Sequence, residues 1–412
     1  MLLVFGAPSQ LLMLVGQEHG RTIPLADMGQ KRSLRFAERM DRENRGWHSA
    51  AMAADEPKLV SVVMPCFNAG AMLRPALQSV IDQTYPHLEV IFIDNNSTDN
   101  SRAVAEEIAT ATGRSIKVMT CPAQGVNHSR NRGYDFARGD YIQWMDADDR
   151  LDPDKIALQV SALERHRESD IAYGDWTSNR IEAGKRPVAD RKNLTQIDDQ
   201  VHRTLAGIWY PPHLYLLRRA AAQRLQELQA WWPGRPVATD VEYSAIAALA
   251  GLRFLHVPGA HVHYNVWGNT QISGATPYAL RAATLQEIFT RLCQFSKSGD
   301  AKAVLSRRHK VLLEQSWDIV RMPADSVVLT KGPGRRVIIR HKASGKEIDL
   351  RPREAAIATL MMSASQPLTS CHHGLMIMQQ RPDVADDPVV VVEAIELLRR
   401  NGFLEAGDRN SP

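Results

Sequence analysis

Cysteine is scarce in this chain of 412 residues, and the four that occur lie far apart without a CxxC pair: Cys66, Cys121, Cys293 and Cys371. This distribution argues against a disulfide framework and against a zinc site built on Cys/His spacing. Cys66 and Cys121 stand at the ends of apolar runs typical of strands, where a free thiol behaves as a small buried hydrophobe. We therefore expect a reducing, cytoplasmic compartment, with peripheral attachment at a membrane as the alternative.

Uninterrupted apolar runs long enough to span a membrane are also missing. The amino-terminal stretch MLLVFGAPSQLLMLVG is broken by Pro8, Ser9 and Gln10 and has no leading positive charge. It fits neither a signal peptide nor a membrane span. We expect residues 1–56 to form an irregular extension, with the natural start of the folded domain near Met52; alternatively, the extension packs on the surface.

Charge of one sign is not in large excess, because 50 Lys and Arg oppose 46 Asp and Glu, for a net charge of +4. A balance this small does not by itself indicate a nucleic acid partner. Hydrophobic residues at 44% and charged residues at 23% are ordinary for a globular protein, which argues against wholesale disorder and against a membrane bundle. The length indicates two or three domains.

From residue 59 onward, short apolar runs alternate with helical segments. The runs are LVSVVM, LEVIFID, SIKVMTC and YIQWMD, rich in Val, Ile and aromatic residues as buried strands are. The first helix is expected over 72–81 with Pro75 in its opening turn, and the second after a cap at 97–99. This order predicts an α/β fold, a mostly parallel sheet with helices on both faces.

Polar side chains follow these strands, where ligands bind in such sheets. The densest group is the acidic cluster Asp146, Asp148 and Asp149, directly after YIQWM. Hard carboxylate oxygens suit Mg²⁺ or Mn²⁺, and a divalent ion there would neutralise a diphosphate leaving group. The alternative is a loop capped by aspartates before a helix at Pro153, and we expect Asp152 and Asp154 to be such caps.

Three stretches together resemble the catalytic core of family 2 glycosyltransferases: VSVVMPCFN, DNNSTDNS and GVNHSRNRGYDFARGDYIQWMDADD. The resemblance extends from Val60 to about His166 and rests on the order and spacing of the motifs. It implies a nucleotide-diphospho-sugar transferase fold of the GT-A type over 57–275. It also implies transfer of a sugar from a nucleotide diphosphate donor, commonly UDP-linked, with Mn²⁺ or Mg²⁺ as cofactor.

The resemblance assigns roles residue by residue. Pro65 and Asn68 would shape the wall of the base-binding site, and Asp94 would accept a hydrogen bond from the nucleobase. The remaining assignments are Arg130 near the nucleotide, Asp146 beside the ribose or a metal-bound water, and Asp148 as the metal ligand, with Asp149 in reserve. Asn95 stands where the family more often has a second aspartate.

Transfer also requires a base that takes the proton from the attacking group. The segment ATDVEYSAIAALAGL resembles the family's Glu-Asp segment at the head of a helix, although Thr239 replaces the usual Glu. Asp240 is therefore the candidate base and Glu242 the reserve. Without the resemblance, a carboxylate at a helix start is equally well a cap.

The family's Tyr-Arg-x-His pattern, which supplies a third metal ligand, is replaced here by Tyr264-Asn265-Val266-Trp267. His261 and His263 stand nearby and are candidates to contact the metal or diphosphate, but the alternation HVHY is typical of a strand with both imidazoles on one face. Four aromatic residues of the intervening region could stack on a sugar or pack in a core: Trp209, Tyr210, Trp231 and Trp232.

The carboxyl-terminal third has a different pattern. Residues 276–319 indicate a helical linker, and 320–412 indicate a small winged-helix-like α+β domain, with a hairpin turning at 332–334, a further strand after 345 and three helical segments. Residues 297–353 carry fourteen Lys and Arg against six Asp and Glu, which marks either a solvated face or a partner site. This region weakly resembles the leader-peptide-binding winged-helix modules of peptide-modifying enzymes.

The leading hypothesis is an inverting glycosyltransferase of the hexosyltransferase type whose acceptor is a peptide bound by the terminal domain. The alternatives are transfer to a surface polysaccharide or lipid-linked glycan, a regulator that binds nucleic acid and senses a nucleotide sugar, and a non-catalytic scaffold. The sequence indicates neither the oligomeric state nor the sugar.

Overall fold

The computed structural model describes residues 15–18, 21–24, 58–181, 188–192, 199–206, 210–266, 276, 278–315, 319–322, 327–331, 337–362, 368–369, 384–385 and 388–406. The chain forms two compact units, Met1–Pro57 and Lys58–Pro412. The first unit, expected to be irregular, contains a hairpin of β1 (Val15–Glu18) and β2 (Arg21–Pro24). Met52 lies outside the described residues.

The first half of the main sheet is parallel, as predicted. Its order is β5-β4-β3-β6, and its strands are β3 (Val60–Cys66), β4 (Leu88–Asp94), β5 (Ser115–Thr120) and β6 (Tyr141–Trp144). All seven residues of β3 and of β4 are buried, because helices cover both faces of these central strands. Cys66 and Cys121 are buried free thiols, as expected.

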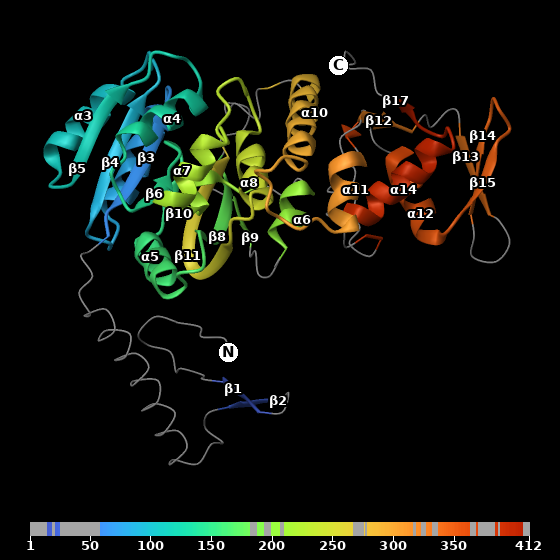
Figure 1. Cartoon of the computed structure of the whole chain (residues 1–412), viewed down its shortest axis with the longest axis horizontal. Coiled ribbons are helices and arrows are strands. Elements are labelled where there is room, and N and C mark those ends of the chain that lie inside the picture. The colour runs from blue at the N-terminus through green and yellow to red at the C-terminus, as the bar shows by residue number, and fades with distance from the viewer. Residues whose placement is uncertain are drawn as a thin grey trace. The chain divides into compact units, whose positions relative to one another are not determined.

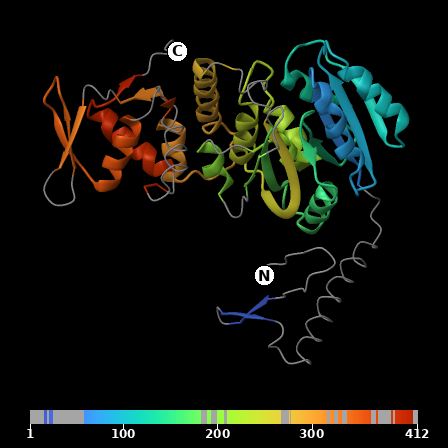
Figure 2. The same ribbon diagram turned by 180° about the vertical axis from the view of Figure 1, so that it is seen from behind.

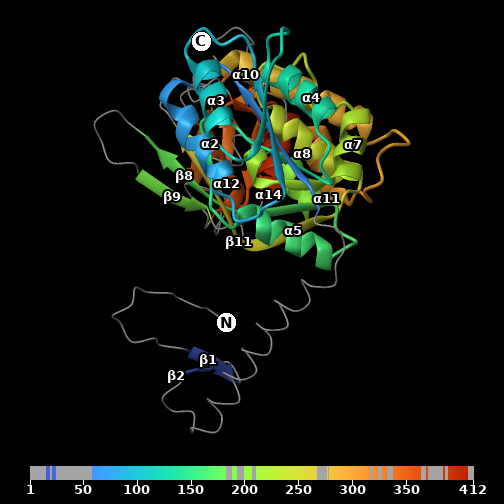
Figure 3. The ribbon, with the colours of Figure 1, turned by 90° about the vertical axis from the view of Figure 1, so that its left-hand side faces the viewer.

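Helices connect these strands with the expected spacing. The segment 70–81 forms the 3₁₀ turn η2 (Gly70–Met72) followed by α2 (Leu73–Ile81), with Pro75 in the opening turn. The next helices are α3 (Ser101–Ala111) and α4 (Val126–Phe136). Helices α2 and α3 lie on one side of the strands and α4 on the other (Figures 1 and 3). Right-handed crossovers require this arrangement, because the chain reverses direction across the sheet after β5.

Beyond β6 the sheet is mixed rather than mostly parallel. It continues in the order β10-β8-β11-β7, with β9 on β8; these strands are β7 (Arg150–Leu151), β8 (Ile171–Arg180), β9 (Val188–Lys192), β10 (Leu216–Arg218) and β11 (Phe254–Val266). Strand β10 runs antiparallel to both neighbours, whereas β8 and β11 are parallel. Strand β10 has only three residues and directly precedes a helix. The sequence therefore contains no pattern from which its antiparallel direction could be predicted.

The remaining described elements between β6 and β11 are helical: α5 (Lys155–Arg165), α6 (Gln200–Leu205), η3 (Pro212–Leu214), α7 (Arg219–Glu227) and α8 (Thr239–Leu249). The expected linker forms α10 (Tyr278–Phe295) and α11 (Arg307–Gln315). Ile288, Leu292 and Leu312 of these helices belong to the same hydrophobic core as the main sheet. The segment 276–319 thus extends that core.

The carboxyl-terminal elements are α12 (Pro352–Met362) and α14 (Pro388–Arg400), a sheet of β13 (Val327–Lys331), β14 (Val337–His341) and β15 (Glu347–Leu350), and a sheet of β12 (Ile319–Arg321), β16 (Leu368–Thr369) and β17 (Glu405–Ala406). Helices α12 and α14 and the sheet of β13, β14 and β15 contribute to a second core (orange and red in Figure 2). The expected hairpin and third strand are present; the turn at 332–334 and the helix at 371–380 lie outside the described residues. Within the described part of the chain, no helix has the length and apolarity needed to cross a membrane.

Candidate functional site

The chain segment that follows β6 contributes two carboxylates to a cluster with a histidine from η3. Ligand atoms of Asp146, Asp149 and His213 all lie within 4.8 Å of one another. His213 Nδ1 is 3.3 Å from Asp149 Oδ2 and 3.8 Å from Asp146 Oδ2. Sequence reasoning missed His213, because a single histidine between Pro212 and Leu214 has no spacing that relates it to Asp146.

His213 and Asp149 are fully buried, and their polar atoms are incompletely satisfied. Among the described residues, Asp149 Oδ2 and both ring nitrogens of His213 have no hydrogen-bond partner. Burial, together with the neighbouring charges of Asp148 and Asp146, raises the pKa of Asp149 well above its usual value. Burial likewise lowers the pKa of His213. A cation bound by this pair would therefore satisfy lone pairs that are buried without a hydrogen-bond partner.

Arg130 of α4 connects this cluster to α8. Its Nη2 donates to Asp146 Oδ1 at 2.8 Å and its Nη1 to Thr239 Oγ1 at 3.3 Å. Burial alone would raise the pKa of Asp146, but the Arg130 guanidinium and His213 hold that pKa well below its usual range. The close approach of α4 to the sheet makes this contact possible, since a Cβ at Gly133 would lie 2.3 Å from Val63 Cγ1.

The predicted base Asp240 lies in the first turn of α8, and its charge interacts with those of Arg130 and Asp146. Burial raises its pKa to about 6, with Arg130 opposing and Asp146 reinforcing the shift. Ala238, the N-cap residue of α8 two positions before Asp240, has φ +56°, a left-handed conformation that costs energy in a non-glycine residue. Such local strain is common where a functional side chain is held in place.

The reserve candidate, Glu242, has a different environment. It is fully buried and accepts hydrogen bonds from Arg235 Nε at 3.0 Å and Arg291 Nη1 at 2.6 Å. Arg291 belongs to α10, so the carboxylate joins two helices. This two-arginine ion pair is a structural arrangement and leaves Asp240 as the better candidate for proton transfer.

The residues predicted to bind the nucleotide stand at the ends of β3 and β4. Asn68 has φ +50°, and its Oδ1 accepts from Thr98 N at 2.7 Å, so it orders the loop after β4. Asp94 is buried, and its Oδ1 accepts from Ser97 N at 3.3 Å. Pro65 is buried within β3, beside Ile93 of β4 in the strand register. The structure thus places Pro65, Asn68 and Asp94 at one sheet edge.

Asn95, which replaces the family's commoner aspartate, has a structural role. Its Nδ2 donates to the carbonyls of Cys121 and Ala123 at 3.0 and 2.8 Å, and its Oδ1 accepts from Gly125 N at 2.7 Å. An ionised aspartate has no donor for these carbonyls. The amide therefore joins the end of β4 to the loop before α4.

Asp148, predicted from the sequence to be the principal metal ligand, lies beside the cluster. Its carbonyl accepts from Asn265 Nδ2 at 2.7 Å, while Asp149 Oδ1 accepts from Asn265 N at 2.6 Å. Asn265 of β11 thereby holds the acidic segment in place. Asp148 is partly exposed, unlike Asp149. The three-residue group in the described structure includes Asp149 and His213 instead of Asp148.

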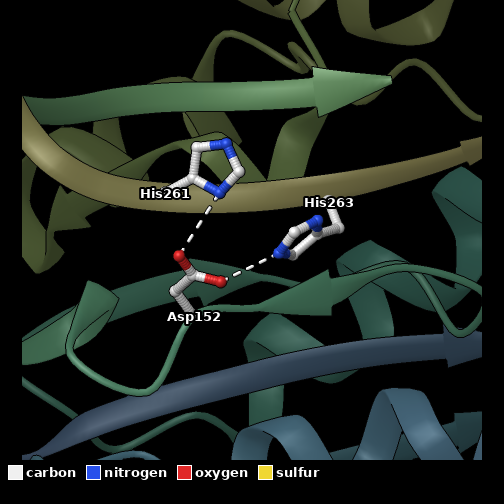
Figure 4. A group of neighbouring side chains, drawn as sticks. All are labelled: Asp152, His261 and His263. Carbon is white, nitrogen blue, oxygen red and sulfur yellow. Dashed lines mark hydrogen bonds and ion pairs between the residues drawn. The ribbon is translucent and has the colours of Figure 1, made fainter. Parts of the chain in front are cut away.

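A separate cluster joins β11 to the segment after β7. His261 Nδ1 is 3.4 Å from Asp152 Oδ2, and His263 Nε2 is 2.9 Å from Asp152 Oδ1 (Figure 4). The prediction that both imidazoles share one face of a strand is confirmed. Asp154 occupies the N-cap position of α5 as predicted, but its side chain makes no capping hydrogen bond, and its Oδ1 accepts from Thr84 Oγ1 at 2.8 Å. The prediction that Asp152 caps this helix is wrong, because its carboxylate faces the two imidazoles.

Two of the four candidate sugar-stacking aromatics have occupied faces. Trp231 lies between the ring of Tyr243, with centroids 4.0 Å apart, and the guanidinium of Arg130 at 4.2 Å. The guanidinium of buried Arg203 lies 3.4 Å from the ring centroid of Tyr210. Both are core residues. Trp232 is 39% exposed, and Trp209 lies outside the described residues.

The acidic segment 146–149 and His213 fit a divalent cation chemically. Three carboxylates and an imidazole are ligands that Mn²⁺ accepts, and Mg²⁺ accepts the carboxylates. The orphaned atoms of Asp149 and His213 are buried groups that an ion would satisfy. The side chains present therefore agree with the metal expected from the sequence.

The region that carries this site is similar to known proteins. Residues 61–225 match the family described as glycosyl transferase family 2. An uncharacterized glycosyltransferase of Haemophilus influenzae is 34% identical over 127 residues, 30% of this chain and 51% of that protein. A PGL/p-HBAD biosynthesis glycosyltransferase of Mycobacterium tuberculosis is 32% identical over 118 residues, 28% of this chain and 46% of that protein. The chain spans about half the length of the curated relatives it matches.

Among solved structures, S. aureus TarS 1-349 in complex with UDP-GlcNAc has a TM-score of 0.49 with this chain at 16% identity, covering 62% of this chain and 70% of that chain. The similarity to glycosyl transferase family 2 covers residues 61–225. The matched range includes Asp94, Arg130, Asp146 and His213 and ends before Asp240.

Proposed function

We propose that the protein is an inverting glycosyltransferase that moves a sugar from a nucleotide diphosphate donor to an acceptor hydroxyl or amide. The observation that carries the proposal is the set of contacts made by Arg130, which binds Asp146 after β6 and Thr239 beside Asp240. These contacts bring the carboxylates of the metal-binding segment and a separate candidate base into one site. A carboxylate that binds a metal suits donor activation, and a second carboxylate that accepts a proton suits activation of the acceptor.

On the donor side, the nucleotide occupies the edge formed by Pro65, Asn68 and Asp94, with a UDP-linked sugar as the first candidate. Asp94 accepts a hydrogen bond from the base, and its hydrogen bond from Ser97 N holds the carboxylate in position. Arg130 and Asp146 lie next to the ribose and diphosphate. The loop ordered by Asn68 closes this end of the site.

Asp146 and Asp148 would hold a divalent ion, Mn²⁺ or Mg²⁺, and Asp149 and His213, which lie close to Asp146, would be additional ligands. When bound, the ion supplies charge neutralisation for the departing diphosphate. Arg130 keeps Asp146 ionised for this purpose, as the lowered pKa of Asp146 indicates. Asn265 fixes the orientation of the acidic segment.

Asp240 acts as the general base. With a pKa of about 6, its carboxylate is mostly ionised at neutral pH and still basic enough to accept a proton. The acceptor oxygen or nitrogen attacks the anomeric carbon as its proton passes to Asp240, and the bond from that carbon to the diphosphate oxygen breaks. In-line attack inverts the anomeric configuration.

The acceptor is proposed to be a peptide captured by the carboxyl-terminal region, with a surface polysaccharide or lipid-linked glycan as the second candidate. Strands β13 and β15 are the outer strands of their sheet in the described structure, and an extended peptide adds to such an edge through backbone hydrogen bonds. The exposed cations of this region, among them Lys346 and Arg353, favour an acidic ligand.

A panel of nucleotide sugars tested for thermal stabilisation, with and without Mn²⁺, examines the donor proposal without knowledge of the acceptor. We expect one donor to raise the melting temperature only when metal is present. Failure of every nucleotide sugar to stabilise the chain would overturn the proposal. Donor binding without hydrolysis or transfer above background would instead favour a non-catalytic scaffold.

A further inference from the structure

The cluster of Asp152, His261 and His263 lies outside the site proposed for sugar transfer. One ligand atom from each residue falls within 4.8 Å of the others. The two imidazoles come from one strand and the carboxylate from the segment after β7, and all three side chains point toward a common centre (Figure 4). Two imidazoles and one carboxylate are a common ligand set for Zn²⁺.

Strand alternation separates this cluster from the Asp146 cluster. His261 and His263 occupy alternate positions of β11, and Tyr264 between His263 and Asn265 points to the opposite face. There the Tyr264 ring stacks on His213, with centroids 6.4 Å apart and planes at 14°. The two groups therefore lie on opposite faces of β11, and an ion bound by His261 and His263 is not the ion of the donor site.

The hydrogen bonds around the imidazoles orient the nitrogens that face Asp152. His261 Nε2 is 2.8 Å from Thr177 Oγ1, so its Nδ1 is the nitrogen directed at the carboxylate. His263 Nδ1 is 3.4 Å from Asn179 Nδ2, so Nε2 is the nitrogen directed at Asp152. A hydroxyl such as Thr177 Oγ1 can accept the far N–H of a metal-binding histidine, and an outer partner of this kind fixes the ring orientation.

The spacing of the ligand atoms is suitable for a tetrahedral ion. Ligands bonded to Zn²⁺ at about 2.1 Å in tetrahedral geometry lie about 3.4 Å from one another. The His261 to Asp152 distance is 3.4 Å and the His263 to Asp152 distance is 2.9 Å. Small side-chain rotations suffice to admit an ion, since Asp152 and His263 are only partly buried.

The structure assigns a second metal site to this chain: we propose that Asp152, His261 and His263 bind one Zn²⁺ ion. A pocket of about 370 Å³ lined by Asp152, His263, Arg150, Asp82 and Ser79 provides access and leaves room for a water as fourth ligand. The ion joins two parts of the chain: Asp152, which lies three residues after Asp149, and strand β11. It stabilises the position of the acidic segment from the face opposite the donor.

The test measures Zn²⁺ bound to the metal-free full-length chain by isothermal titration calorimetry and by elemental analysis, with Co²⁺ visible absorption as a report of tetrahedral imidazole ligation. We expect His263→Gln and His261→Gln each to lose this Zn²⁺ and the Co²⁺ spectrum. Thr177→Val, which removes an outer partner, should weaken Zn²⁺ binding by roughly 10- to 100-fold.

His256→Gln is the matched control, because His256 also lies on β11 and pairs with a carboxylate, Asp175, at 3.0 Å, but has no third ligand in its group. It should leave Zn²⁺ binding unchanged. Asp149→Asn should leave this Zn²⁺ in place whether or not the proposed transferase function holds, so the two proposals fail separately. Equal Zn²⁺ content in the wild type and in both folded glutamine variants, checked by circular dichroism, would overturn the assignment, as would equal loss in His256→Gln.

Discussion

Arg130 Nη2 lies 2.8 Å from Asp146 Oδ1, and the same guanidinium reaches Thr239 Oγ1 at 3.3 Å. One buried cation thus positions a carboxylate after β6 and the first residue of α8. The guanidinium also packs on the Trp231 ring, with Cζ 4.2 Å from the ring centroid. The relative position of the donor-side carboxylate and the candidate base therefore depends on a single side chain.

Replacing Arg130 by Met should destabilise the protein by about 3 kcal/mol at pH 7, because it leaves the mostly buried Asp146 carboxylate without its counter-charge. The pKa of Asp146 is depressed in the folded state, so its contribution to stability is present above the unfolded pKa and is lost as pH falls through the folded pKa. The variant should show a weaker loss of stability on acidification. Urea denaturation at pH 7 and pH 4 measures both effects.

The control is Arg74→Met, which breaks an exposed pair with Glu107 and should change stability by less than about 1 kcal/mol. Equal losses of stability in the Arg130 and Arg74 variants would contradict the account based on a buried pair.

Asp240→Asn should lower transfer by at least about a hundredfold while donor affinity stays within a few-fold, because only proton removal is lost. Single-turnover transfer and donor titration separate the two quantities. Glu242→Gln is the comparison: it should reduce stability by removing the partner of Arg235 and Arg291. Near-normal transfer by Asp240→Asn would assign the base elsewhere.

The raised pKa of Asp240 also predicts how stability and rate depend on pH. The folded state binds the Asp240 proton more tightly than the unfolded state, so stability falls as pH rises from about 4 through about 6. The rate of transfer should rise over the same interval as the base ionises. Asp240→Asn should lose the pH-dependent fall in stability and melt at a higher temperature than the wild type at pH 7. A wild-type rate that is flat between pH 5 and 7 would argue against Asp240.

Asp148→Ala and Asp149→Ala should differ. Asp148 is partly exposed in a loop, so its removal should abolish metal-dependent donor binding with the fold intact. Asp149 is buried and accepts from Asn265 N, so its removal should also lower the melting temperature. Mn²⁺-dependent thermal shifts with and without donor distinguish the outcomes; unchanged donor affinity in Asp148→Ala with metal present would remove Asp148 from the metal site.

Removing residues 1–57 should preserve donor binding, because the compact unit that contains the site begins at Lys58. The comparison is the full-length chain under the same assay. An insoluble product, or one that no longer binds donor, would mean that the first unit contributes to the second.

Local sequence patterns were sufficient for the parallel half of the sheet and for several site residues. Apolar runs of strand length with polar residues at their ends located β3, β4 and β6, and with them Asn68, Asp94 and Asp146. The alternation HVHY placed His261 and His263 on one face because side chains of a strand have a period of two. The resemblance to the family supplied Arg130 and Asp240, which no local period would have selected.

Only the tertiary structure showed which of these side chains have partners, because those partners are distant in the chain. Glu242 is bound by Arg291, 49 residues away, and Asp152 faces His263, 111 residues away. His213 joins the acidic cluster because β10 inserts antiparallel beside β6 and draws η3 over the strand ends. Periodicity reports which face of an element is buried, whereas the identity of the group on the other side of a contact is decided by how the elements pack, and packing depends on the whole chain at once.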